Sequence, residues 1–220
     1  LAKISCCCFQ YRSRFRSNRR AAPRTSRRRR HRRAMTDATT ARRRERMDDP
    51  DDLGPISATP DLMVTRALAF ADVSPDDIVY DLGCNDGRVC VAAALERGAR
   101  SVGIEIDPGA CAVARERAAR ANALVKKDLV RVEEASAFDA SASEATVVFS
   151  YLLPKGNAKL GAKLLRELKP GSRVVTYLFK MPEETWGEKL TRVESFASSR
   201  ERASGGVDSS AFNKLYLYVV

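Results

Sequence analysis

The chain has 220 residues, enough for one domain of ordinary size, and a formal net charge of +11. Residues 1–47 carry 17 Lys and Arg against 2 Asp and Glu (+15), so residues 48–220 keep 22 basic and 26 acidic side chains (−4). Nucleic-acid binding could therefore depend only on the first segment. The single histidine, His31, also lies in that segment, which excludes Ser-His-Asp hydrolases and most zinc enzymes.

The segment before the folded part is predicted to be a disordered basic tail, 1–47, followed by a Pro-, Gly- and Asp-rich linker, 48–58. Three interpretations of the tail stay open. Residues 1–34 could be a transit peptide to a mitochondrion or plastid, or the arginine clusters could form a nuclear or nucleic-acid-binding arm. Alternatively, translation starts at Met35 and the protein is cytoplasmic. The scattered cysteines and the lack of a long apolar run predict an intracellular protein without a membrane span.

The folded domain is predicted over 59–220, where helical and strand patterns alternate. The predicted helices are 61–71, a helix capped by Asn85 or Asp86 and ending near Arg97, 108–122 and 157–168. The predicted buried strands are 78–82, 101–106, 129–132, 145–150 and 174–179. Residues 137–144 are too few for a crossover helix, and 190–196 and 214–219 indicate a closing antiparallel pair joined by a Ser/Gly loop. This order predicts a three-layer α/β domain.

The residues that follow the first two strands indicate a ligand site. The first strand ends in Asp81 and leads into a turn that contains Gly83 and Gly87, whereas the second ends near Glu105. Glycine lets the backbone approach a ligand closely, and Asn85 is the kind of residue that tolerates a left-handed conformation. Right-handed crossovers would bring the turn and Glu105 to the same edge of the sheet, where the Glu105 carboxylate could accept hydrogen bonds from a ribose.

The spacing of these residues also discriminates between cofactors. Dinucleotide sites use G-x-G-x-x-G before a helix, where the helix dipole favours a pyrophosphate. Here the glycines are separated differently, and Asp81 adds a negative charge that suits a cationic or amine-bearing ligand. S-adenosylmethionine carries a sulfonium, an amino group and a ribose, so it fits this site better than a nicotinamide dinucleotide does.

The stretch YDLGCNDGR at 80–88, with VGIEID at 102–107, resembles the first two motifs of class I S-adenosylmethionine-dependent methyltransferases. The resemblance extends over about 59–220. It implies a Rossmann-like three-layer sandwich with a mostly parallel seven-stranded sheet and an antiparallel C-terminal strand pair. The SATP stretch at 57–60 and the Asp-Gly-Arg end of the turn are similar to small single-domain protein-lysine methyltransferases and their uncharacterised bacterial relatives.

The resemblance implies roles for individual positions of this sequence. The methionine end of the cofactor would be held around Asp81 and the turn, and the ribose by Glu105. The complete set of expected cofactor-binding residues is Asp81, Gly83, Cys84, Asn85, Gly87, Glu105, Ile106, Ser136, Ala137 and Ser150. Ser136 stands where the family often has an acidic residue for the adenine amino group, so that contact could come from Ser136, from backbone or from Asp139. No metal is expected.

The residues after the fourth predicted strand bear on the acceptor. SYLLP at 150–154 replaces the Asn/Asp-Pro-Pro-aromatic motif of many nucleic-acid-amino and glutamine methyltransferases, which argues against those acceptors. Tyr151 is the candidate catalytic residue, and Leu152 and Leu153 could line an apolar channel that lowers the pKa of a lysine. Methyl displacement needs mainly positioning, so the lack of histidine is no obstacle.

The expected function is therefore protein-lysine N-methylation with a protein substrate. The alternatives are an RNA or small-molecule methyltransferase, or a non-enzymatic Rossmann-like protein that binds RNA through the basic tail. An NAD-dependent oxidoreductase is disfavoured, and the oligomeric state is not indicated.

Overall fold

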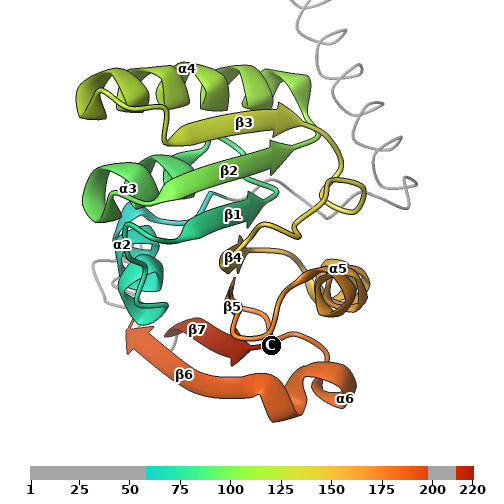
Figure 1. Ribbon diagram of the computed structural model, residues 1–220. Coiled ribbons are helices and arrows are strands. Elements are labelled where there is room, and N and C mark those ends of the chain that lie inside the picture. Colours follow the sequence, from blue (N-terminus) through green and yellow to red (C-terminus); the bar gives the residue numbers. More distant parts are fainter. Residues whose placement is uncertain (1–57, 198–211) are drawn as a thin grey trace, which may run out of the picture. The chain divides into compact units, whose positions relative to one another are not determined.

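The computed structural model describes residues 58–197 and 212–220, which belong to one compact unit (Figure 1). The predicted basic tail 1–47, the linker up to residue 57 and the Ser/Gly loop over 198–211 lie outside the described residues. Within the described part of the chain, no helix is long and apolar enough to cross a membrane.

Seven strands form one sheet in the order β3-β2-β1-β4-β5-β7-β6 (Figure 1). Their bounds are β1 Ile78–Leu82, β2 Arg100–Glu105, β3 Val130–Glu134, β4 Val147–Ser150, β5 Arg173–Tyr177, β6 Leu190–Ala197 and β7 Phe212–Val219. The first five strands pair in parallel, and β7 lies antiparallel between β5 and β6. The predicted fold, a Rossmann-like sandwich with an antiparallel C-terminal pair, is confirmed.

Helices cover both faces of this sheet, which explains why β1, β2, β4 and β5 are buried along nearly their whole length. The helices are α2 Asp61–Phe70, α3 Arg88–Arg97, α4 Pro108–Val125, α5 Pro154–Glu167 and the short α6 Glu183–Trp186. Successive residues of a strand point to opposite faces. Accordingly Val79 packs in the cluster built with α2 and α3, whereas Tyr80 and Leu82 pack in the cluster built with α5 and α6.

The starts of two helices differ from the prediction. α3 begins at Arg88, and its N-cap residue is Gly87 in the left-handed conformation; the Asp86 side chain nevertheless accepts a hydrogen bond of 3.3 Å from the Arg88 amide of the first turn. α5 begins at Pro154, three residues before the expected start, because proline lacks only an amide that the first turn of a helix leaves unused. The start of α4 at Pro108 agrees with the prediction, and the Asp107 side chain caps it.

A close contact at Gly103 joins β2 to the turn after β1 and to α3. A Cβ atom on Gly103 would lie 2.6 Å from Cys84 Sγ and 3.2 Å from Cys90 Sγ, so β2 passes directly beneath these two buried thiols. Among the described residues, Cys84, Cys90 and Cys111 are buried and form no disulfide.

This contact predicts that Gly103→Ala destabilises the protein. The added methyl group would overpack the space beside Cys84, and such overpacking costs about 1–3 kcal/mol. Urea unfolding should therefore show a lower midpoint for the variant. When Cys84 is first replaced by alanine, adding Gly103→Ala should lower the midpoint by less than it does in the wild type. Equal midpoints for wild type and Gly103→Ala would contradict the contact.

Candidate functional site

The turn between β1 and α3 contains three residues with a left-handed backbone: Gly83 (φ 90°), Asn85 (φ 49°) and Gly87 (φ 73°). It is fixed to the end of β2, because the amides of Gly83 and Cys84 both donate to the carbonyl of Ile104 at 2.9 Å. A hydrogen bond of 2.8 Å from the Gly87 amide to the Cys84 carbonyl closes the turn. The predicted tolerance of Asn85 for this conformation is confirmed.

Glu105, at the end of β2, holds this turn with its side chain. Its Oε2 accepts a hydrogen bond from the Asn85 amide at 2.8 Å, and its Oε1 accepts one from the Asp107 amide, also at 2.8 Å. The turn and Glu105 therefore meet at one edge of the sheet, as predicted. Each carboxylate oxygen retains a second lone pair, so the side chain can still accept hydrogen bonds from a ribose. The next residue, Ile106, is 51% exposed.

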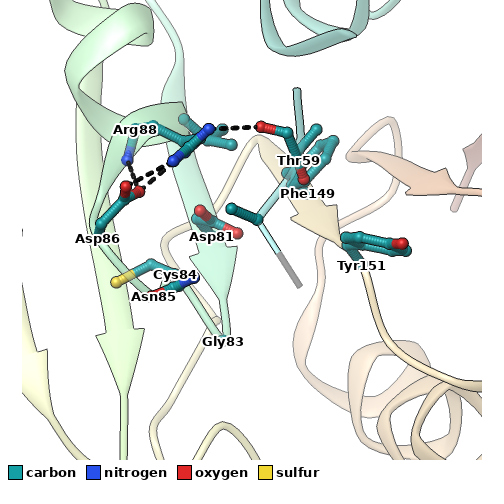
Figure 2. Close-up of a pocket in the computed structure, with 11 residues that line it drawn as sticks. Thr59, Asp81, Gly83, Cys84, Asn85, Asp86, Arg88, Phe149 and Tyr151 are labelled. Carbon is teal, nitrogen blue, oxygen red and sulfur yellow. Dashed lines mark hydrogen bonds and ion pairs between the residues drawn. The ribbon is translucent and has the colours of Figure 1, made fainter. Parts of the chain in front are cut away.

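A pocket opens beside the turn, where the strand order reverses between β1 and β4 (Figure 2). It is lined by residues from the turn, from the end of β4 and from the segment before α2: Ala58, Thr59, Asp81, Gly83, Cys84, Asn85, Asp86, Arg88, Val89, Phe149 and Tyr151. Five of the predicted site residues line it, namely Asp81, Gly83, Cys84, Asn85 and Tyr151. Ligands of open α/β sheets bind at this kind of reversal.

The carboxylate of Asp81 occupies the middle of the pocket (Figure 2). The residue is only 4% exposed, and no donor from the described residues forms a hydrogen bond with its side chain. Burial, together with the negative charges of Glu105 and Asp86, raises the pKa of Asp81 from 3.8 to about 8. A buried carboxylate without a partner that faces a cavity suits a ligand with a positively charged group.

Arg88 forms a hydrogen-bond network on one wall of the pocket (Figure 2). Its Nε and Nη2 donate to the two carboxylate oxygens of Asp86, at 2.9 and 2.7 Å. Its Nη1 donates to the Thr59 carbonyl at 2.9 Å and to Asp61 at 3.1 Å. The hydrogen bonds from Arg88 hold the pKa of Asp86 below its usual value. Sequence reasoning singled out the stretch 57–60 and the Asp-Gly-Arg turn separately but did not predict this contact.

Tyr151 forms the wall at the end of β4. Its ring packs edge-on against Tyr177, with 4.7 Å between the ring centroids, and the Tyr177 hydroxyl donates to Asn213 Oδ1 at 2.5 Å. Beyond it, Leu152 is buried in the core, whereas Leu153 is partly exposed. Of the two leucines that were expected to line an acceptor channel, only Leu153 is open to solvent.

The other predicted cofactor residues lie outside this pocket. A Cβ on Gly87 would come within 3.1 Å of Ala114 Cβ, so this glycine also permits the close packing of α3 on α4. Ser136 accepts a hydrogen bond from the Phe138 amide at 3.2 Å, and the neighbouring Ala137 is buried. Ser150 is completely buried, with its hydroxyl 3.4 Å from Asn157 Oδ1. Contact between these residues and a cofactor stays a prediction.

Comparison with known proteins agrees with this geometry. Residues 81–187 match the ANTKMT methyltransferase domain family. A protein-lysine N-methyltransferase of Saccharolobus islandicus (strain REY15A) is 37% identical over 172 residues, or 76% of this chain and 93% of the relative.

Solved structures show the same fold. The crystal structure of an RNA methyltransferase from Salinibacter ruber in complex with S-adenosyl-L-homocysteine is 37% identical, with a TM-score of 0.61 over 74% of this chain and 94% of that one. TrmN from Thermus thermophilus is 14% identical and shows the fold alone, with a TM-score of 0.57 over 74% of this chain and 50% of that one.

The fold, the turn and these relatives define the protein as an S-adenosylmethionine-dependent methyltransferase. Within that class, the chain belongs to the ANTKMT methyltransferase family. The enzyme class and the cofactor predicted from the sequence are confirmed.

The raised pKa of Asp81 predicts how its replacement changes stability. The carboxyl is neutral in both the folded and the unfolded chain only well below pH 3.8, and it destabilises the fold increasingly as the pH rises from 3.8 to about 8. Asp81→Asn removes this titration. Urea denaturation should show the smallest difference in stability near about pH 3 and a variant more stable than wild type by more than about 1 kcal/mol near pH 8. A difference that does not change with pH would contradict the assignment.

Proposed function

We propose that this enzyme is a protein-lysine N-methyltransferase. The observation that carries the proposal is the protein-lysine N-methyltransferase of Saccharolobus islandicus, which this chain matches at 37% identity along 93% of its length. A match over this length extends beyond the cofactor turn and includes the residues directly after β4, which face the acceptor in this proposal.

The residues at the edge of the sheet fit S-adenosylmethionine, which when bound supplies a methyl group attached to a sulfonium. In this proposal the Asp81 carboxylate binds the amino group of the cofactor, and the turn 83–87 provides backbone contacts. Glu105 binds the ribose through its free lone pairs, and the exposed side chain of Ile106 contacts the adenine. Among the described residues no donor pairs with the Asp81 side chain in the pocket, which supports this assignment.

Phe149 and Tyr151 form the side of the pocket that we call the acceptor wall. This wall suits a lysine side chain, which must lose its proton before it reacts. There is no histidine in 48–220 that could act as a base, so desolvation has to lower the pKa of the lysine. Phe149 and Tyr151 provide an apolar, aromatic surface next to Asp81. The Tyr151 hydroxyl can accept a hydrogen bond from a neutral amine, and an aromatic face attracts methylated ammonium groups.

Charge also favours a basic protein over a nucleic acid as the substrate of the folded domain. Residues 48–220 carry a net charge of −4, and Asp61 beside the pocket has a side chain that is 91% exposed. A negative surface attracts lysine-rich segments and repels phosphates. The second candidate is RNA methylation, which the name of the Salinibacter ruber structure supports.

These candidates are separated by incubating the full chain with methyl-labelled S-adenosylmethionine and fractionated cell extract. We expect label that resists nuclease, is released by protease and is recovered as methyl-lysine after hydrolysis. Label that is lost on nuclease treatment would contradict lysine as the acceptor and support RNA.

Two Tyr151 variants serve as controls in the same assay. Tyr151→Ala should lower the turnover about 100-fold because the acceptor loses its positioning wall. Tyr151→Phe keeps the ring, so its turnover isolates the contribution of the hydroxyl. Full turnover of both variants would exclude Tyr151 from the acceptor wall.

The assignment of Asp81 to the cofactor amino group predicts a pH-dependent affinity. Only the ionised carboxylate attracts the ammonium group, so the affinity should rise up to about tenfold per pH unit from pH 6 toward 8. It should level off above about pH 8, where an α-amino group loses its proton. Calorimetry at constant ionic strength measures this dependence. Asp81→Asn should bind weakly at every pH, and wild-type affinity in this variant would overturn the assignment.

A further inference from the structure

The segment 58–60, just before α2, forms one wall of the pocket beside the turn, where methyl transfer takes place in this proposal. Ala58 and Thr59 line the pocket together with Asp81 and Tyr151, although they are distant from both in the sequence. Thr59 is 6% exposed, and the carbonyl of the next residue, Pro60, accepts the first hydrogen bonds of α2, from the amides of Met63 and Val64. The first turn of α2 therefore holds this wall in place at Pro60.

Arg88 holds the other end of the wall. A hydrogen bond of 2.9 Å joins its Nη1 to the Thr59 carbonyl, so the wall is fastened through the backbone and not through the threonine side chain. The ion pair of Arg88 with Asp61 reinforces the contact only weakly, because Asp61 is largely exposed to solvent. The hydrogen bond to Thr59 is thus the specific link between α3 and the wall (Figure 2).

The same guanidinium is fixed to the cofactor turn. Asp86, the turn residue before Gly87, binds Arg88 with both carboxylate oxygens and also forms an ion pair of 3.0 Å with Arg117 of α4. A planar guanidinium can bind a carboxylate in this two-point manner and still donate from Nη1 to a carbonyl. Arg88 therefore connects the turn beneath the cofactor to a wall of the pocket that the acceptor enters.

We propose that Arg88 is a positioning residue for methyl transfer, which aligns the wall at 58–60 with the cofactor turn and so orients the acceptor. Its side chain touches neither reactant in this proposal. It acts through the Thr59 carbonyl, and its loss lowers the rate of methyl transfer more than the affinity for the cofactor. The proposal rests on the acceptor entering past Tyr151, as proposed above, but not on the acceptor being lysine.

Three variants of the full chain test this proposal. Arg88→Ala removes all the contacts, and Arg88→Lys keeps the charge but cannot bind Asp86 at two points and Thr59 together. Arg117→Ala is the matched control, because it removes another cation from Asp86 and leaves Thr59 untouched. Calorimetry gives the affinity for S-adenosylhomocysteine, and label transfer to whichever acceptor the wild type modifies gives kcat and KM.

We expect Arg88→Ala and Arg88→Lys to bind S-adenosylhomocysteine within about threefold of wild type. Their kcat should fall about 100-fold, because a reactant displaced by about 1 Å loses that much rate. Hydrogen–deuterium exchange, which needs no acceptor, should be faster over 59–64 in both variants and unchanged in Arg117→Ala. Arg117→Ala should also keep wild-type turnover.

Two results would overturn the proposal. Wild-type kcat in Arg88→Lys would show that a positive charge at this position is sufficient. Equal losses of cofactor affinity and turnover would show that Arg88 only stabilises the cofactor turn. If the wild type labels RNA and not protein, lysine as the acceptor is wrong. The kcat of each variant relative to wild type, measured on RNA and compared with its relative cofactor affinity, still decides the role of Arg88.

Discussion

The hydrogen bond from the Asn85 amide to Glu105 determines how the charges of this site are distributed. It holds the turn in a left-handed conformation at Asn85 and satisfies one carboxylate oxygen of Glu105, while the Asp107 amide satisfies the other. Asp81 lies close to this pair and receives no such donor from the described residues. Two neighbouring carboxylates thus have different environments, one paired with backbone and one left unpaired in the pocket. The unpaired group is preorganised for a cation before any ligand arrives.

The sheet topology explains why both halves of the site meet at this turn. The chain leaves β1 in one direction to form β2 and β3, and later returns to the other side of β1 to form β4. The segments that follow β1 and β4 therefore lead to different sides of the sheet, and the pocket lies between them, lined by Asp81 of β1 and by Tyr151 after β4. Arg88 adds a link across this opening, from the turn to the segment that precedes α2. The sheet and α3 together position groups that are far apart in sequence.

Sequence reasoning succeeded where the residues are close in the chain or related by the handedness of crossovers. Asp81, Asn85 and Glu105 follow strand ends, and parallel strands bring their ends to one edge, so their proximity could be predicted. The contact of Arg88 with Thr59 could not, because it joins residues 29 positions apart through a backbone carbonyl, which leaves no trace in side-chain identity.

Two other features depend on tertiary packing. The N-cap position of α3 is taken by Gly87 in the left-handed conformation, and the Asp86 carboxylate before it accepts hydrogen bonds from both the amide and the side chain of Arg88. Likewise, the burial of Ser150 against Asn157 follows from α5 beginning at Pro154, which the sequence pattern did not indicate.

The position of β7 between β5 and β6 has a consequence for synthesis on the ribosome. Leu215 and Leu217 of β7 complete the core on one face of the sheet, and Tyr216 and Tyr218 complete the core on the other. Neither layer can close before this late-translated strand emerges, and until then the edge of β5 is open to pairing with other chains. The nascent protein should therefore depend on chaperones until translation of β7 is finished, even though its cofactor turn was synthesised long before.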